Sequence, residues 1–168
     1  MGWIGGLLMI AAGTGMGLYA SHRLRRRVLF LEMCGRMLQT LWQEMSYTAR
    51  PMPELWRRLA QGEGFATFSL VQDTAKALSD TPFAEAFSVA VHKAEGEGLL
   101  LPPARQLLLE FAAGCGHTDL VGQQAHIEYY RTLLSAQEEE SRCVWQEKGR
   151  MYRVLGLAGG MALMLLLM

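Results

Sequence analysis

Two uncharged segments constrain what this chain can fold into more than any other feature of its sequence. Residues 1–21 and residues 154–168 contain no charged side chain. As a helix, the stretch from Trp3 to Tyr19 would span about 24 Å, close to the hydrocarbon thickness of a bilayer. The second segment would span about 22 Å, which a locally thinned bilayer accommodates. We therefore predict two transmembrane helices, at 1–21 and 151–168.

Basic residues border both segments on the side that faces the middle of the chain. The positive-inside rule then places residues 22–153 in the cytoplasm and both termini across the membrane. Arginines next to a bilayer would also contact anionic headgroups. Two alternatives stay open: a signal peptide, which would need its positive charge before the apolar run, and a buried core helix at 154–168. The basic residues are Arg23, Arg25, Arg26, Arg27, Lys148, Arg150 and Arg153.

Pairs of glycines at four-residue spacing occur in both uncharged segments, at Gly13 and Gly17 and at Gly156 and Gly160. Small residues at this spacing let membrane helices approach closely, so the pairs predict helix-packing faces. The alternative is that glycine is simply common in membrane helices. "GTGMG" at 13–17 resembles a nucleotide-binding loop only superficially, because no strand precedes it and no Lys-Ser/Thr ending follows.

The middle of the chain has helical periodicity throughout. Apolar residues recur at three- and four-residue steps from Leu24 to Met45, which predicts one long amphipathic helix rather than a coiled coil of four heptads. The prolines of "TARPMPE" end that helix. Five more helices follow, with Thr81 expected as the N-cap of one of them. We predict an all-α fold, an antiparallel six-helix bundle at 22–150 flanked by an N-terminal and a C-terminal transmembrane helix. The later helices are expected to start near Pro53, Phe65, Pro82, Pro102 and Thr118–Asp119.

The sequence offers little catalytic chemistry. Lys and Arg total 16 and Asp and Glu total 16, so no overall field indicates a nucleic-acid partner. Three widely spaced cysteines suit a reducing compartment rather than a disulfide framework. One cluster has metal-ligand types, but its Cys-x-His spacing is not typical of zinc sites, and neither Cys115 nor Cys143 is expected to act as a nucleophile. We therefore expect no enzyme activity, no cofactor and no metal site. The cluster contains Cys115, His117, Asp119 and His126.

Three carboxylates lie near the predicted helix breaks: Glu44, Glu54 and Glu85. If those breaks gather at one end of the bundle, the carboxylates would form an acidic patch facing a basic partner. The alternative is a solvated surface on which glutamates near helix N-termini interact favourably with the helix dipole. We treat the three glutamates as candidates for partner docking.

Four blocks of the sequence resemble the stage III sporulation protein AB family and together cover essentially the whole chain. "LWQEMSYTARPMPELWRRLA" resembles the family's first signature, with matches at Glu44, Tyr47, Pro51 and Glu54. "TPFAEAF" is similar to the next helix start, and "GCGHTDLVGQQ" to a later Gly-Asp-Gln stretch. "EKGRMYRVLGLAGGMALMLLLM" resembles the family's terminal hydrophobic helix. The departure is Ala49-Arg50, where the family prefers a Thr before the proline.

This resemblance implies a soluble domain similar to the F-type platform domain of type II secretion and type IV pilus machines. It implies a place in the channel-like complex between mother cell and forespore, in the mother-cell membrane, among other stage III sporulation membrane proteins. The AA protein of that complex resembles a secretion ATPase, and an F-like platform would dock it. Tyr47 joins the docking candidates because it belongs to the family's first signature. Homo-oligomerisation stays open.

Two other functions stay open on the sequence alone. The first is an F-type inner-membrane platform of a pilus or general secretion system, although such proteins usually carry two copies of the bundle and this chain has room for one. The second is a membrane-tethered sensor or enzyme, which a bound metal or nucleotide would favour.

Overall fold

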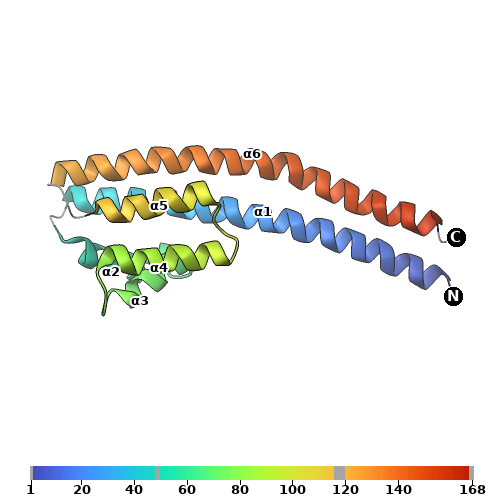
Figure 1. The fold of residues 1–168 in the computed structure, drawn as a ribbon, viewed down its shortest axis with the longest axis horizontal. Coiled ribbons are helices and arrows are strands. Elements are labelled where there is room, and N and C mark those ends of the chain that lie inside the picture. Colours follow the sequence, from blue (N-terminus) through green and yellow to red (C-terminus); the bar gives the residue numbers. More distant parts are fainter. Residues whose placement is uncertain (1, 48–49, 116–119, 167–168) are drawn as a thin grey trace. The chain divides into compact units, whose positions relative to one another are not determined.

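A computed structural model describes residues 2–47, 50–115 and 120–166 of the chain. It is 87% helical and has no strand among the described residues, so the predicted all-α class with six helices is confirmed. The helices follow one another along the chain as labelled in Figure 1. They are α1 (Gly2–Tyr47), α2 (Met52–Gln61), a short 3-10 turn η1 (Glu63–Phe65), α3 (Ser69–Ala77), α4 (Phe83–Gly96), α5 (Pro102–Gly114) and α6 (Leu120–Leu166).

The chain folds into two compact units. Unit 1 contains Met1–Val28 and Glu139–Met168, and unit 2 contains Leu29–Glu138. The two long helices, α1 and α6, contribute to both units, and unit 2 also contains the four short helices. The sequence placed the bundle at 22–150, whereas residues 22–28 and 139–150 group with unit 1.

The predicted long first helix is confirmed. α1 runs without a break from Gly2 to Tyr47, a stretch that contains no proline. α2 begins at Met52 and has Pro53 in its first turn, where the missing backbone N–H would have no helical partner anyway. The prolines therefore separate these two helices, as the sequence indicates.

The predicted start of the third helix was wrong. A 3-10 turn occupies Glu63–Phe65, and α3 begins only at Ser69. The side-chain amide of Gln72 holds this turn by donating to the carbonyl of Ala60 (2.8 Å) and to that of Phe65 (3.0 Å). The backbone N–H of Phe68 also donates to the carbonyl of Phe65 (3.1 Å), a three-residue step typical of tight turns.

The predicted cap of α4 was also wrong. Thr81 does not cap the helix, because its hydroxyl donates instead to the carbonyl of Ala77 (2.9 Å) at the end of α3. Pro82 occupies the N-cap position and contributes no side-chain hydrogen bond. A threonine between two closely spaced helices can satisfy the end of the first or the start of the second, and here it does the former.

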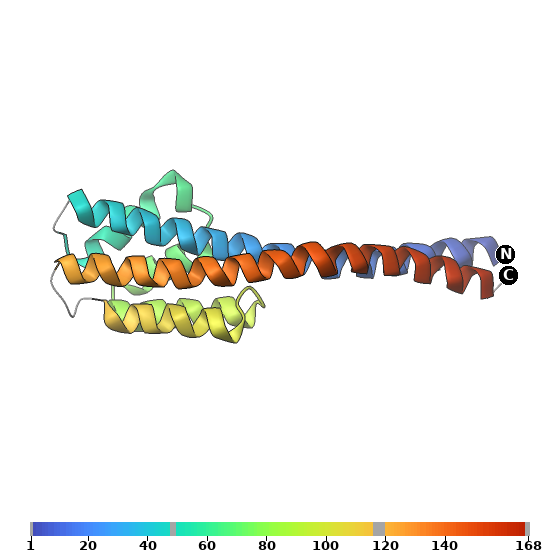
Figure 2. The same ribbon diagram turned by 90° about the horizontal axis from the view of Figure 1, so that it is seen from above.

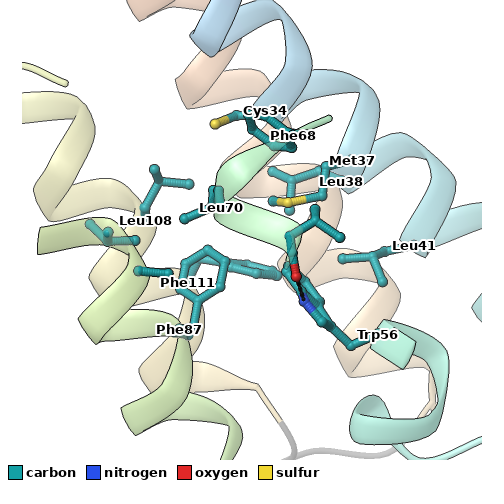
Figure 3. Close-up of a cluster of buried hydrophobic side chains, with 14 of the residues drawn as sticks. Cys34, Met37, Leu38, Leu41, Trp56, Phe68, Leu70, Phe87, Leu108 and Phe111 are labelled. Carbon is teal, nitrogen blue, oxygen red and sulfur yellow. Dashed lines mark hydrogen bonds between the residues drawn. The ribbon is translucent and has the colours of Figure 1, made fainter. Parts of the chain in front are cut away.

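The core of unit 2 centres on Trp56, which is completely buried. Its ring lies 5.1 Å from that of Phe83 and 5.4 Å from that of Phe87, and its indole N–H donates to the carbonyl of Val71 (3.2 Å). A buried tryptophan of this kind stabilises a fold by apolar burial and requires a partner for its N–H. Figure 3 shows this cluster, to which α1 contributes Cys34, Met37, Leu38 and Leu41.

Two ion pairs join consecutive short helices of unit 2. Lys93 of α4 contacts Asp73 of α3 at 2.7 Å, and Arg105 of α5 contacts both carboxylate oxygens of Glu95 in α4 at 2.9 and 3.2 Å. The hydrogen bond from Lys93 to Asp73 raises the pKa of the lysine. These ion pairs are partly exposed and contribute less than the apolar core, which stabilises the unit.

Unit 1 is an antiparallel pair formed by the start of α1 and the end of α6, which run alongside each other in Figures 1 and 2. Ser21 and Gly149 are buried at their contact. A side-chain carbon added at Gly149 would lie 3.1 Å from Oγ of Ser21 and 3.2 Å from Cδ1 of Trp145. Glycine at this position therefore lets the two helices approach closely.

The predicted transmembrane segments are helical wherever they are described. Among the described residues, no helix combines the length and the apolar character that crossing a bilayer requires. The side chains of most residues in 1–21 and 151–168 lie outside the described set. The packing contacts predicted for Gly13, Gly17, Gly156 and Gly160 fall there as well.

Candidate functional site

The helix breaks that the sequence singled out gather at one end of unit 2. α1 ends at Tyr47, and α2 and α4 both begin at this same end (Figure 1). Tyr47 is 88% exposed. Glu85 lies in the first turn of α4 and is also exposed. Glu54, in the first turn of α2, is exposed too, so three of the four docking candidates are accessible to a partner at this end.

Glu54 and its surroundings differ from the predicted acidic patch. Its carboxylate forms an ion pair with Arg50, one helical turn earlier. Arg57 and Arg58 on α2 are both exposed, and neither forms an ion pair with a described residue. The exposed surface of α2 is consequently net positive. The fourth candidate, Glu44, is half-buried and already engaged in a contact.

A surface groove of about 240 Å³ lies beside this end, between α1 and α6 of unit 2. Trp42, which is 39% exposed, lines the groove together with four polar or charged side chains. A hydrogen bond from the amide of Gln124 to the hydroxyl of Ser46 (3.1 Å) joins the two helices nearby. The groove thus offers an aromatic face among hydrogen-bonding groups. Its other lining residues are Gln39, Gln43, Glu128 and Arg131.

His126 of the predicted metal-type cluster has a structural role at the contact of α5 and α6. Its Nε2 lies 2.9 Å from the carbonyl oxygen of Phe111, and its ring stacks on the ring of Phe111 at 5.7 Å. Tyr130 approaches the imidazole edge-on at 4.7 Å. A side-chain carbon added at Gly114 would lie only 2.2 Å from Cε1 of His126. Gly114 is therefore required by the close approach of this imidazole.

Two of the three cysteines, Cys34 and Cys115, have the properties of packed residues, whereas Cys143 is exposed. Burial raises the pKa of the Cys34 thiol and raises that of Cys115 to about 12, so both thiols are protonated near neutral pH. A thiol is a nucleophile or metal ligand only as the thiolate. The described residues contain no group of three or more metal-ligating side chains, and His117 and Asp119 lie outside them.

Exposed cationic side chains surround the helix pair of unit 1. Arg23, Arg25, Arg26, Lys148 and Arg150 are all exposed, whereas Arg27 is half-buried and engaged in a contact. The side chain of Arg153 lies outside the described set. The predicted membrane-flanking residues that are described therefore surround one short stretch of unit 1.

Sequence reasoning missed two features near these sites, the groove at Trp42 and the contact at Gly149. The groove could have been suspected from Gln39 and Gln43, which flank Trp42 on the polar side of an otherwise apolar stripe. A single glycine inside the charged helical run "EKGR" is the corresponding signal for a close helix approach.

The comparison with known families agrees with the sequence resemblance. The family model for stage III sporulation protein AB matches residues 2–168. The chain belongs to the stage III sporulation protein AB family. A solved structure of stage III sporulation protein AB shares 20% identity and a TM-score of 0.60, covering 72% of this chain and 97% of that chain. At this identity the likeness shows the fold. No protein with curated function matches the chain.

Membership in the stage III sporulation protein AB family makes this chain a sporulation protein. The family match extends over both uncharged segments as well as the helices between them. Beyond the family assignment, the structure describes three surface features: the exposed end at Tyr47, the Trp42 groove and the cationic surface of unit 1.

Proposed function

We propose that the chain is a non-enzymatic platform held in the mother-cell membrane around the forespore, as part of a secretion-like channel complex. The observation that carries this proposal is the match to the stage III sporulation protein AB family across residues 2–168. The buried Trp56 core and the high pKa of Cys115 support a structural rather than a catalytic role for unit 2.

Two transmembrane helices, at 1–21 and 151–168, attach the platform to the membrane, with residues 22–150 in the cytoplasm. Support comes from the uncharged composition of both segments and from the basic residues on their inner sides. A reporter enzyme that is active only outside the cytoplasm should be active when it is fused to either terminus. A cysteine-labelling reagent that cannot cross the membrane should fail to reach Cys143 from outside. Labelling of Cys143 from outside intact cells would contradict this topology.

The end of unit 2 at Tyr47 docks a cytoplasmic ATPase of the secretion type, and the membrane helices pass its position or motion to other stage III sporulation membrane proteins. Tyr47 and Glu85 are exposed there, and an exposed tyrosine is a frequent anchor in protein interfaces. Glu44 and Glu54 are kept as candidates, although Arg50 partly neutralises Glu54. A basic partner surface would interact favourably with this group.

A pull-down with the full-length chain in lipid nanodiscs tests the docking surface against the AA-type ATPase of the same cell. The variant E44K/E54K/E85K should weaken binding at least tenfold, because reversed charges oppose a basic partner. E63K/E97K/E110K changes the same charge elsewhere on unit 2 and should bind like the wild type. R57E/R58E separates the alternatives. If it abolishes binding while the triple glutamate variant binds normally, the ATPase contacts the positive surface of α2 and the acidic hypothesis is wrong.

A further inference from the structure

Five exposed cationic side chains form what we call the basic collar of unit 1: Arg23, Arg25 and Arg26 on α1, and Lys148 and Arg150 on α6. None of them forms an ion pair with any residue that the structure describes. Unpaired surface arginines and lysines in such numbers repel one another unless counter-charges are bound. The collar therefore favours an anionic ligand.

The pairing of the two helices brings the α1 residues and the α6 residues of the collar to the same position along the helix pair. Ser21 lies against Gly149, with 3.1 Å between its Oγ and the position of an added side-chain carbon. Lys148 and Arg150 flank Gly149 in the sequence, and Arg23 follows Ser21 by two residues. The positive charges of two segments far apart in the sequence thus surround one cross-section of the pair.

An exposed apolar band begins directly beyond the collar on both helices. On α1, Leu18 is 53% exposed and Tyr19 74%, and on α6, Met151 is 48% exposed and Val154 60%. Among the side chains that the structure describes, cationic residues are followed by apolar ones within about one helical turn on each helix, and Arg153, between Met151 and Val154, lies outside that set. Adjacent exposed apolar side chains of this size on two paired helices indicate an interaction site rather than ordinary surface.

We infer that the basic collar binds the phosphate groups of anionic phospholipids, while the apolar band beyond it contacts the acyl chains and Tyr19 lies at the interface. Guanidinium groups bind phosphate oxygens in a bidentate manner, and arginine supplies four of the five charges. A nucleic acid would satisfy the collar but leave the apolar band in water, which favours a lipid surface. This inference rests on the proposed membrane attachment and adds a preference for lipid charge.

The test uses the full-length chain reconstituted in phosphatidylcholine bilayers containing a small fraction of spin-labelled phosphatidylglycerol or spin-labelled phosphatidylcholine. Even one basic residue near an anionic surface is worth about fivefold in association, so the wild type should prefer the labelled phosphatidylglycerol by at least about fivefold. R23Q/R25Q/R26Q should bring the preference towards one. R57Q/R58Q/K76Q removes the same charge from exposed positions of unit 2 and should keep the wild-type preference.

The outcomes separate this inference from the proposed function. If the wild type incorporates into bilayers but shows equal association with both lipids, the inference is wrong and the membrane attachment stands. If the wild type does not co-float with vesicles of either lipid, both are wrong. Roughly 1 M salt should reduce the preference for phosphatidylglycerol in the wild type, because the screening length falls to about 3 Å. A preference that is insensitive to salt and equally lost in the unit 2 control variant would also contradict a role for the collar.

Discussion

Replacing Gly114 with alanine tests the contact between α5 and α6 most directly. The new methyl carbon would lie 2.2 Å from Cε1 and 2.6 Å from Nε2 of His126, so the imidazole has to move. Moving it breaks its hydrogen bond with the carbonyl of Phe111 and its ring contacts with Phe111 and Tyr130. The hydrogen bond is worth about 1 kcal/mol and the ring contacts about 0.5–1.5 kcal/mol each.

Alanine also has a higher helix propensity than glycine, by up to about 1 kcal/mol inside a helix and less at its last residue. We therefore expect Gly114→Ala to lower the free energy of unfolding by about 1–3 kcal/mol, in the range typical of overpacked sites. In a His126→Ala background the obstacle is absent, and the same substitution should be neutral or slightly stabilising. The coupling energy of the double-mutant cycle should then be about 1–4 kcal/mol.

Urea unfolding of the full chain in mild detergent, followed by circular dichroism at 222 nm, measures all four proteins of the cycle. Gly35→Ala is the matched control, because an added side-chain carbon at this helical glycine meets nothing within 4 Å. It should stabilise by up to about 1 kcal/mol in both backgrounds, with no coupling to His126. A Gly114→Ala substitution that destabilises equally with and without the imidazole would refute the reasoning.

Two further predictions concern buried groups of unit 2. Trp56→Ala should lower the free energy of unfolding by about 3–5 kcal/mol. Trp56→Phe should lower it by clearly less, because phenylalanine keeps most of the packing and loses only the hydrogen bond to Val71. Urea titrations of both variants measure this order, and equal losses would contradict it. Burial raises the pKa of Cys115 from 9.0 to about 12, so the neutral thiol stabilises the folded state fully below about pH 9 and this stabilisation is lost as the pH rises towards 12. Between pH 9 and pH 10.5 the wild type should therefore lose about 1–2 kcal/mol more than Cys115→Ala, in which Cys34 is unchanged, and parallel losses would show that Cys115 titrates normally.

The helices were predictable because their signals are local. Prolines at 51 and 53 and at 102 and 103 mark helix starts through the missing N–H, whatever the rest of the fold does. Thr81 shows the limit of such signals, since its hydroxyl donates to the carbonyl of Ala77 at the end of α3 and does not cap α4. The same holds for Trp42 and Trp56, one exposed and one buried, which no periodicity distinguishes with certainty.

The candidate site was less predictable than the fold, because it depends on contacts between side chains. Glu54 was expected to belong to an acidic patch, but Arg50 lies four residues earlier and forms an ion pair with it. Both residues are visible in the sequence, yet their pairing across the start of α2 requires the backbone geometry of the turn. Gly149 acquires its role only once Ser21 is placed opposite to it, and that partner lies in a distant part of the chain.

That distance has a consequence for the order in which the chain folds during synthesis. Gly149 follows Ser21 by 128 positions, so the early part of α1 leaves the ribosome long before its partner helix exists. At about 5–20 residues per second, the delay is roughly 6–26 s. Leu18 and Tyr19 are exposed even in the finished helix pair, and during this interval the partner helix does not shield them at all. The nascent chain therefore needs a lipid surface or a chaperone to cover its first helix during this delay.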